Sequence, residues 1–152
     1  MKWPRAVILM LCLLAMCVAS PAVAQTRVEE TALATTVYTG GWFQRHSERP
    51  WSGGTAAFSA SVGAHATLMF IGTGVSWIGF RGPQAGIARV SLDGVQVAQV
   101  DTYAPAEQLQ AVLFSSTGLT ADLHILMIDP TGTRNPAATD AFIVVDAFDV
   151  TP

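Results

Sequence analysis

The chain has 152 residues, of which 51% are hydrophobic and 12% charged, with 8 Lys and Arg against 11 Asp and Glu. This composition is typical of a globular domain with an apolar core, and a formal net charge of −3 excludes the clustered basic charge on which nucleic-acid binding depends. The same charge balance gives little attraction to an anionic membrane surface.

Residues 1–24 have the features of a secretory signal peptide. Two basic residues precede an apolar run, residues 6–18, and the segment ends in the small-residue motif Ala22-Val23-Ala24. The run is shorter than the roughly 20 apolar residues that cross a membrane. We therefore expect cleavage before Gln25, no membrane insertion afterwards, and a secreted or periplasmic product.

Both cysteines, Cys12 and Cys17, lie within this segment. Residues 25–152 therefore contain no thiol for a disulfide, a zinc site or a nucleophile. Their number suits a single domain, which buries about two thirds of the surface of its unfolded chain.

The first part of this domain is predicted to contain an edge strand and a long irregular segment. Residues 26–37 alternate in a way that suits a strand with one buried face. Residues 38–54 are framed by glycine pairs and carry their large apolar groups at Trp42, Phe43 and Trp51. Loops of this length inside a domain are usually functional or disordered, and two tryptophans argue against disorder.

Further strands are expected at residues 55–61, at residues 66–71 and through residues 70–100. In the last region, runs rich in Val, Ile, Phe and Trp are separated by Gly72-Thr73-Gly74, by residues 82–86 and by Asp93-Gly94. Glycine supplies turn dihedrals, so this pattern predicts a meander of antiparallel strands. Asp93-Gly94 is the sharpest signal, because a two-residue type I′ turn needs positive φ at both positions.

The C-terminal part reads as strands at residues 110–115, 123–129 and 141–150, with a long turn at residues 130–140. The first of these strands competes with a helical interpretation, because Leu109, Val112 and Leu113 also have helical spacing. About eight to nine short strands without intervening helices predict an all-β fold, an antiparallel β-sandwich or jelly roll.

Groups suited to catalysis are few. His46, His65 and His124 are dispersed without metal-ligand spacing, and no nucleophile elbow accompanies them. Glycoside hydrolysis needs two carboxyl groups across one bond, but Asp146 and Asp149 point to opposite faces of a regular strand. We therefore expect a protein that is not an enzyme.

Calcium is the metal that the acidic residues suit best, because it takes carboxylate and carbonyl oxygens. Glu30 near the first strand and Asp146 near the last are the candidate ligands of a structural calcium ion, since the two chain ends commonly meet in sandwich folds. Surface acids that serve only solubility are the simpler interpretation, and both stay open. No cofactor is otherwise expected.

Aromatic side chains in loops are candidates for stacking on a sugar ring. Trp51 and Tyr103 lie in predicted loops, and Arg134 and Asn135 lie in another. The two aromatic residues fit equally well as a cover over the end of the sandwich. Trp77 lies within a predicted strand and is expected in the core.

Several segments resemble the galactose-binding-like jelly-roll domains of bacterial secreted proteins, which are similar to several carbohydrate-binding modules. The resembling segments are FIGTGVSWIG at residues 70–79, VSLDG at 90–94, GTRNP at 132–136 and VVDAFDV at 144–150. The resemblance covers about residues 51–150. It implies a module of the kind that is often attached to hydrolases or cell-surface proteins.

Together these features predict an exported, non-catalytic module that binds a polysaccharide or cell-surface glycan weakly at a loop end of the sandwich. The residues expected to contact the glycan are Trp51, Asp101, Tyr103, Arg134 and Asn135. The alternative is a protein-interaction or cell-envelope structural module without a sugar ligand, whose partner would be another envelope protein.

Overall fold

The computed structural model describes residues 23–32 and 34–152. The expected signal peptide, residues 1–24, lies outside the described residues except for its last two positions, so its cleavage stays a prediction. Within the described residues no helix is long and apolar enough to span a membrane. The strands of the described part are β1 (Thr26–Glu29), β2 (Thr36–Thr39), β3 (Phe43–His46), β4 (Ala56–Ser59), β5 (His65–Arg81), β6 (Ile87–Leu92), β7 (Val95–Asp101), β8 (Gln108–Pro130), β9 (Ile143–Val145) and β10 (Ala147–Thr151), with one 3₁₀ turn, η1 (Ser52–Gly54).

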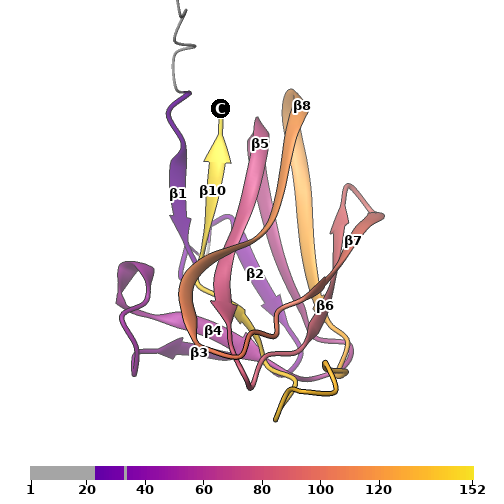
Figure 1. The fold of residues 1–152 in the computed structure, drawn as a ribbon. Coiled ribbons are helices and arrows are strands. Elements are labelled where there is room, and N and C mark those ends of the chain that lie inside the picture. Colours follow the sequence, from indigo (N-terminus) through magenta and orange to yellow (C-terminus); the bar gives the residue numbers. More distant parts are fainter. Residues whose placement is uncertain (1–22, 33) are drawn as a thin grey trace, which may run out of the picture.

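These strands form two sheets that pack as a sandwich (Figure 1). The larger sheet has seven strands in the order β1-β10-β5-β8-β6-β7, and β2 also pairs with β5; the smaller sheet has the order β3-β4-β9. All of these strand pairs are antiparallel. The predicted antiparallel β-sandwich is therefore confirmed.

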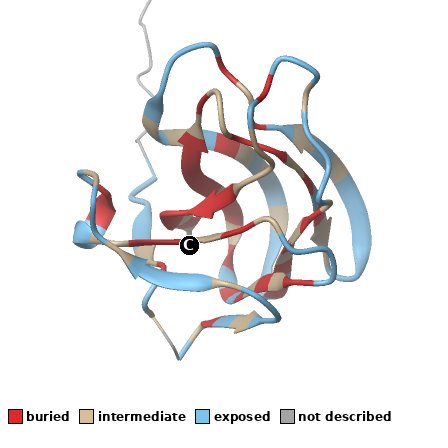
Figure 2. Ribbon diagram, turned by 90° about the horizontal axis from the view of Figure 1, so that it is seen from below, coloured by how far each residue is buried: buried red, intermediate tan, exposed pale blue. Residues whose placement is uncertain are grey.

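The main core lies between the two sheets, where Figure 2 shows the buried segments surrounded by exposed ones. Because successive strand residues point to opposite faces, every second residue of the long strand β5 is buried over its first half. Trp77 is fully buried, as expected, and its indole N–H donates to the carbonyl oxygen of Val144 over 3.1 Å. The largest fully buried side chains of this core are Trp77, Phe148, Leu68, Leu126, Ile128 and Ile143.

One predicted turn is confirmed and another is wrong. Asp93 and Gly94 have φ of 52° and 80° and join β6 to β7, as the type I′ pattern requires. Gly72-Thr73-Gly74, in contrast, lies inside β5, which runs without a break through it. A Cβ at Gly72 would overlap the carbonyl oxygen of Thr151, so glycine permits close approach of a neighbouring backbone here and does not form a turn.

Other boundaries also differ from the prediction. Residues 26–37 contain β1 and the start of β2 in place of one strand, and residues 110–129 belong to one continuous strand, β8. Residues 141–150 are divided at Asp146, where the chain leaves the smaller sheet and enters the larger one. The residues before Asp146 therefore belong to the smaller sheet, and the residues after it belong to the larger sheet.

Candidate functional site

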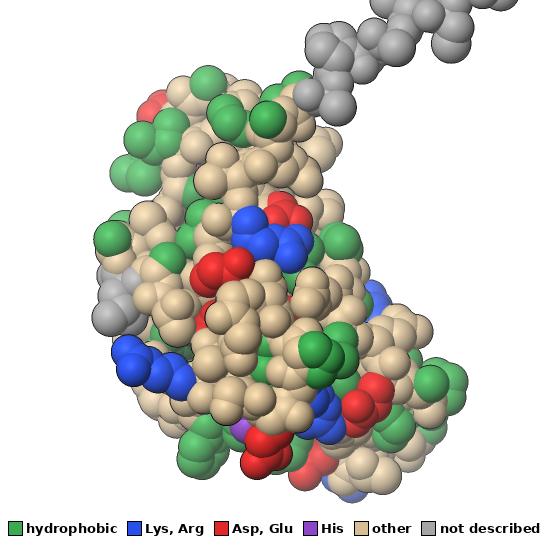
Figure 3. All heavy atoms as spheres, turned by 90° about the vertical axis from the view of Figure 1, so that its left-hand side faces the viewer, with side chains coloured by type: hydrophobic (Ala, Val, Ile, Leu, Met, Phe, Trp, Pro, Cys, Tyr) green, Lys and Arg blue, Asp and Glu red, His purple; other side chains and the backbone are tan. Residues whose placement is uncertain are grey.

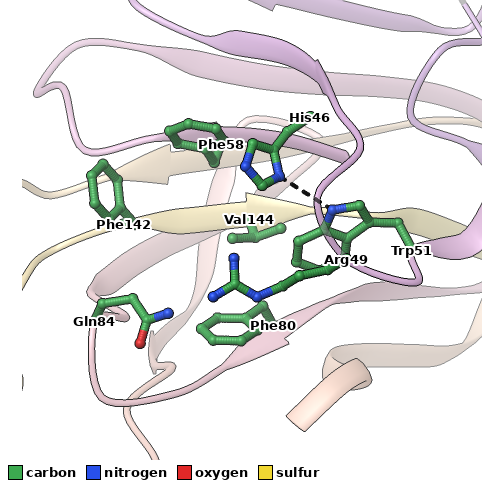
Figure 4. A pocket seen from close by; sticks show the side chains of 8 residues that line it. All are labelled: His46, Arg49, Trp51, Phe58, Phe80, Gln84, Phe142 and Val144. Carbon is green, nitrogen blue, oxygen red and sulfur yellow. Dashed lines mark hydrogen bonds between the residues drawn. The ribbon is translucent and has the colours of Figure 1, made fainter. Parts of the chain in front are cut away.

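A pocket of about 220 Å³ lies on the face of the smaller sheet that points away from the main core. Val144 of β9 forms part of its wall, whereas its neighbours Ile143 and Val145 pack into the main core. Loops on either side of the sheet complete the pocket, as Figure 4 shows. The lining residues are His46, Arg49, Trp51, Phe58, Phe80, Gln84, Phe142 and Val144.

The walls of the pocket are aromatic side chains in edge-to-face contact. The ring of Phe58 meets that of Phe142 at 5.4 Å and 89°, and that of His46 at 5.2 Å and 88°. On the other wall Trp51 meets Phe80 at 6.2 Å and 74°. Such pairs fix one another's orientation, so the pocket has a rigid apolar lining.

Trp51 and His46 are joined by a hydrogen bond, drawn as a dashed line in Figure 4. The indole N–H of Trp51 donates to Nδ1 of His46 over 3.3 Å. Because Nδ1 accepts, a neutral His46 carries its proton on Nε2, which lies 3.4 Å from a carboxylate oxygen of Glu48. The polar edge of His46 at the pocket is therefore a donor.

The rim of the pocket is polar, and its central group is Arg49. The guanidinium carbon lies 5.6 Å from the centre of the Phe80 ring, a cation–π arrangement. Two guanidinium nitrogens donate to Glu107, Nη2 to Oε1 over 2.7 Å and Nε to Oε2 over 3.3 Å. The amide of Gln84 donates to the same Oε1 over 2.9 Å. These hydrogen bonds lower the pKa of Glu107.

Of the predicted ligand-binding residues, Trp51 is the one that lines this pocket. Asp101 and Asn135 are brought together elsewhere, where the Asn135 amide donates to Asp101 Oδ2 over 2.7 Å and the Tyr103 backbone N–H donates to Oδ1 over 3.0 Å. Arg134 donates to the carbonyl oxygen of Thr139 over 2.7 Å.

These four residues border the same loop that carries Gln84 into the pocket, residues 82–86. Tyr103 forms a bridge with Gly82, and the backbone N–H of Thr139 donates to the carbonyl oxygen of Pro83 over 2.7 Å. The predicted residues therefore form two groups, Trp51 at the pocket and the other four near the loop that carries Gln84.

Sequence reasoning missed most of the pocket residues. Arg49 precedes Pro50 and Trp51 in the sequence. Its position next to a tryptophan in a predicted loop could therefore have indicated that it lies at the site. Phe80 and Phe142 gave no such signal, because a strand phenylalanine that faces a pocket has the same pattern as one that faces the core.

Both predicted metal ligands are buried and lie next to each other. Glu30 is 2% exposed and Asp146 is 0% exposed, and the Glu30 backbone N–H donates to the Asp146 carbonyl over 3.3 Å. Asp146 Oδ1 accepts from the Ser52 backbone N–H over 2.8 Å, and Glu30 accepts from the hydroxyl of Thr55. One oxygen of each carboxyl group has no protein partner, and the same holds for Oε2 of Glu29.

Burial dominates the electrostatics of this acidic cluster, which we define as Glu29, Glu30 and Asp146. Desolvation raises the pKa of Asp146 to about 7, with further increments from the neighbouring glutamates, and it also raises the pKa of Glu30. At the surface beside the cluster Arg27 forms a bidentate pair with Asp149, with both distances 2.7 Å. Basic and acidic side chains intermingle on this side of the molecule, which carries β1 (Figure 3).

The cluster offers oxygen atoms without partners, which is the chemistry that a calcium ion takes. As placed in the described residues, however, no three His, Cys, Asp or Glu side chains form a group that could hold a metal ion. Calcium binding would therefore have to recruit further oxygens, such as hydroxyl or carbonyl groups.

No known protein-family profile matches the chain. Two curated relatives from Flavonifractor plautii are similar to part of it. An A type blood N-acetyl-alpha-D-galactosamine deacetylase is 35% identical over 95 residues, 62% of this chain and 12% of the relative. An A type blood alpha-D-galactosamine galactosaminidase is 34% identical over 92 residues, 60% of this chain and 8% of the relative.

These relatives correct one expectation. The sequence predicted a protein that is not an enzyme, whereas both curated relatives are named as enzymes. The chain spans about a tenth of their length.

Solved structures of carbohydrate-active proteins share the fold. A Paenibacillus xanthan lyase matches with a TM-score of 0.57 and 16% identity, over 88% of this chain and 14% of the lyase. A two-domain esterase active on acetylated mannans matches with a TM-score of 0.64 and 14% identity, over 88% of this chain and 39% of the esterase. The solved structures show the fold, a β-sandwich, and the curated relatives that resemble part of the chain are named as carbohydrate-acting enzymes.

Proposed function

We propose that the chain binds carbohydrate as a galactose-binding-like jelly roll, and that the pocket around Trp51 receives one sugar residue. The observation that carries this proposal is the pocket itself, a concave site with aromatic walls and a few polar groups at its rim. This is the usual composition of small-molecule sites. At about 220 Å³ the pocket lies below the range of about 300–1,000 Å³ for such sites, which favours a single sugar unit over an oligosaccharide.

The polar groups at the rim match the hydroxyl groups of a sugar. Arg49 and His46 supply donors, and the Gln84 side chain supplies both a donor and an acceptor. The C–H surface of the sugar would pack against Phe58, Phe142 and the Trp51 wall. An open site of this kind binds weakly, with a dissociation constant of roughly micromolar to millimolar, about 4 to 8 kcal/mol.

The second group of predicted residues extends this site. Asp101, Tyr103, Arg134 and Asn135 lie near residues 82–86, the loop that carries Gln84 into the pocket, and we propose that they contact the next sugar of a polysaccharide or cell-surface glycan. The hydrogen bond between Asp101 and Asn135 pre-orients both side chains, which lowers the entropic cost of using them.

Calorimetric titration tests the proposal, with galactose, N-acetylgalactosamine and mannose as monosaccharides and their oligosaccharides as longer ligands. Phe142→Ala should weaken binding of a monosaccharide about tenfold or more. Asn135→Ala should weaken only the oligosaccharides, and Val95→Ala, an exposed site on β7, is the control. If no saccharide binds, the proposed function is wrong; if Asn135→Ala weakens monosaccharides and Phe142→Ala does not, the site is misplaced.

We also propose that the acidic cluster binds a structural calcium ion. The support is the set of buried carboxyl oxygens without partners, because a buried charge without compensation is costly and a cation removes that cost. Glu30 and Asp146 would hold the ion, together with hydroxyl or carbonyl oxygens recruited from neighbouring groups. Bound calcium would fix β1 against the start of β10.

Export stays part of the proposal, with a secreted or periplasmic product. N-terminal sequencing of the mature protein tests it, because cleavage before Gln25 is the expected result.

A protein-interaction role, with another envelope protein as partner, is the second candidate function. It is favoured by an apolar group on the outer face of the larger sheet, where Ile71 is 70% exposed and Leu123, opposite it on β8, is 59% exposed. Exposed neighbouring apolar residues often mark an interface. Binding of a purified envelope protein that is lost in Ile71→Asp and kept in Phe142→Ala would favour this role over glycan binding.

A further inference from the structure

The guanidinium group of Arg49 is already bound to a carboxylate, and that carboxylate belongs to the chain itself. Glu107 accepts two hydrogen bonds from Arg49 and one from Gln84. Both donor residues line the pocket, whereas Glu107 does not. Arg49 and Gln84 thus form a carboxylate receptor at the rim of the pocket, in which they donate three hydrogen bonds. In this structure the receptor holds the carboxylate of Glu107, a residue that does not line the pocket.

Arg49 and the loop that carries Gln84 have contacts that do not involve Glu107. Arg49 lies over the Phe80 ring at 5.6 Å, which fixes the plane of its guanidinium group against a buried side chain. Gln84 belongs to residues 82–86, whose backbone is bonded to neighbouring segments at Gly82, Gln84 and Gly86. A receptor that stays in place when its occupant leaves can take another ligand of the same chemistry.

Glu107, in contrast, is easily displaced. Its side chain is 45% exposed, and it lies in the exposed segment that precedes β8. Exposed ion pairs of this kind contribute little to stability. A ligand that brings its own carboxylate and also fills the pocket therefore has the advantage over Glu107.

We propose that the pocket selects a sugar that carries a carboxylate, a uronic acid unit, and that its carboxylate replaces Glu107 on Arg49 and Gln84. This inference rests on the proposed function, because it names the class of sugar for the same pocket. A planar carboxylate matches the two parallel donors of a guanidinium group, and Glu107 shows that geometry in place. Displaced Glu107 becomes solvated at the rim.

Matched sugar pairs test the inference by calorimetry. Galacturonate is compared with galactose, and glucuronate with glucose, because the members of each pair differ at C6 alone. The uronate of at least one pair should bind about tenfold more tightly than its neutral partner. Sodium acetate at the same concentration should compete poorly, since it brings the carboxylate without the sugar.

Variants distinguish displacement of Glu107 by the ligand carboxylate from the general effect of removing one negative charge. Glu107→Gln removes the internal competitor and should tighten uronate binding about two- to fivefold, with less than a twofold change for the neutral sugar. Asp122→Asn is the control, because it removes one negative charge at an exposed position on β8 that does not line the pocket, and it should leave both ligands within twofold. Arg49→Lys should weaken the uronate about tenfold, because Lys lacks the bidentate fork.

The outcomes are distinguishable. Neutral sugars that bind as tightly as uronates overturn the inference and leave the proposed function standing, whereas no binding of any sugar overturns both. Competition by acetate equal to that by the uronate, or equal tightening of both ligands in Glu107→Gln, also overturns the assignment of a uronic acid. Thermal unfolding of each variant within about 2 °C of the unaltered protein shows that the fold is retained.

Discussion

Asp146 and Ser52 are joined by a buried hydrogen bond of 2.8 Å in which the Ser52 backbone N–H donates to the Asp146 carboxyl group, 94 residues further along the chain. The bond ties η1 to the position where the chain changes sheets. The second oxygen of Asp146 has no protein partner. Its hydrogen bonds therefore do not replace the hydration that the ionised carboxylate loses on burial. Burial raises the pKa of Asp146 to about 7.

The first prediction concerns stability against pH without calcium. The pKa of Asp146 in the folded protein, about 7, lies above the ordinary value of 3.8, so the folded state binds this proton more tightly than the unfolded chain. The stabilisation of the folded state by this proton is complete below about pH 4 and is lost as the pH rises to about 7. Urea unfolding in EDTA should show the free energy of unfolding fall by up to about 3 kcal/mol between pH 5 and 8. Asp146→Asn should reduce this slope, leaving the contribution of Glu30, whose pKa is also raised, and equal slopes in both proteins would contradict the assignment.

The second prediction concerns calcium at neutral pH. If calcium binds the acidic cluster, millimolar CaCl₂ at pH 7.5 should raise the midpoint of thermal unfolding, and a concentration of 100 dissociation constants adds about 2.7 kcal/mol. The rise should disappear in Glu30→Gln and Asp146→Asn, and should persist in Asp122→Asn, an exposed site on β8. At pH 5 the effect should shrink, because protons compete for the same oxygens. An unchanged midpoint in calcium and in EDTA would remove the metal from the proposal.

The third prediction concerns His124. Its Nδ1 lies 2.8 Å from Asp93 Oδ2 and its Nε2 lies 2.8 Å from the carbonyl oxygen of Thr120. Both partners are acceptors, so they favour the doubly protonated ring, and the Thr120 and Asp93 hydrogen bonds raise the pKa of His124. An NMR titration should give a value above 6.5, and Asp93→Asn should lower it. Asp129→Asn, beside His65, should leave the His124 titration unchanged.

The fourth prediction compares two glycines. A Cβ at Gly72 would overlap the carbonyl oxygen of Thr151, so Gly72→Ala must displace the end of β10 and should cost about 2 kcal/mol or more. Gly94 has φ of 80° and open space around its Cβ direction, and asparagine tolerates this conformation. Gly94→Asn should therefore cost less than about 1 kcal/mol. Chemical denaturation measures both, and equal costs would contradict the different roles given to the two glycines.

Turns and strands could be predicted from the sequence where adjacent residues alone determine the local structure. Asp93-Gly94 is such a case, because the turn type depends on two adjacent residues. Gly72 is the opposite case, because its role depends on Thr151, which lies 79 positions away. The same limit applies to residues 115–117, which resemble a loop by composition but pair with β5, for example Ser116 with Val75.

The candidate site was predictable only in part, for a related reason. Trp51 could be chosen because a tryptophan in an irregular segment is unusual, and the structure places it at the pocket. The receptor formed by Arg49 and Gln84 could not be found, because a salt bridge between Arg49 and Glu107 leaves no local signal in the sequence. Glu30 and Asp146 were paired correctly in space, since the chain ends meet, whereas their neighbour Glu29 was overlooked.

Strand β1 pairs with β10, so that Thr26 lies opposite Val150 at the edge of the larger sheet. β1 and β10 thus depend on each other for pairing. The conformational entropy lost when two segments so far apart in the sequence come together opposes this pairing. A nascent chain cannot complete this edge of the sheet until β10 has been synthesised. This delay favours slow, late folding of the edge strand.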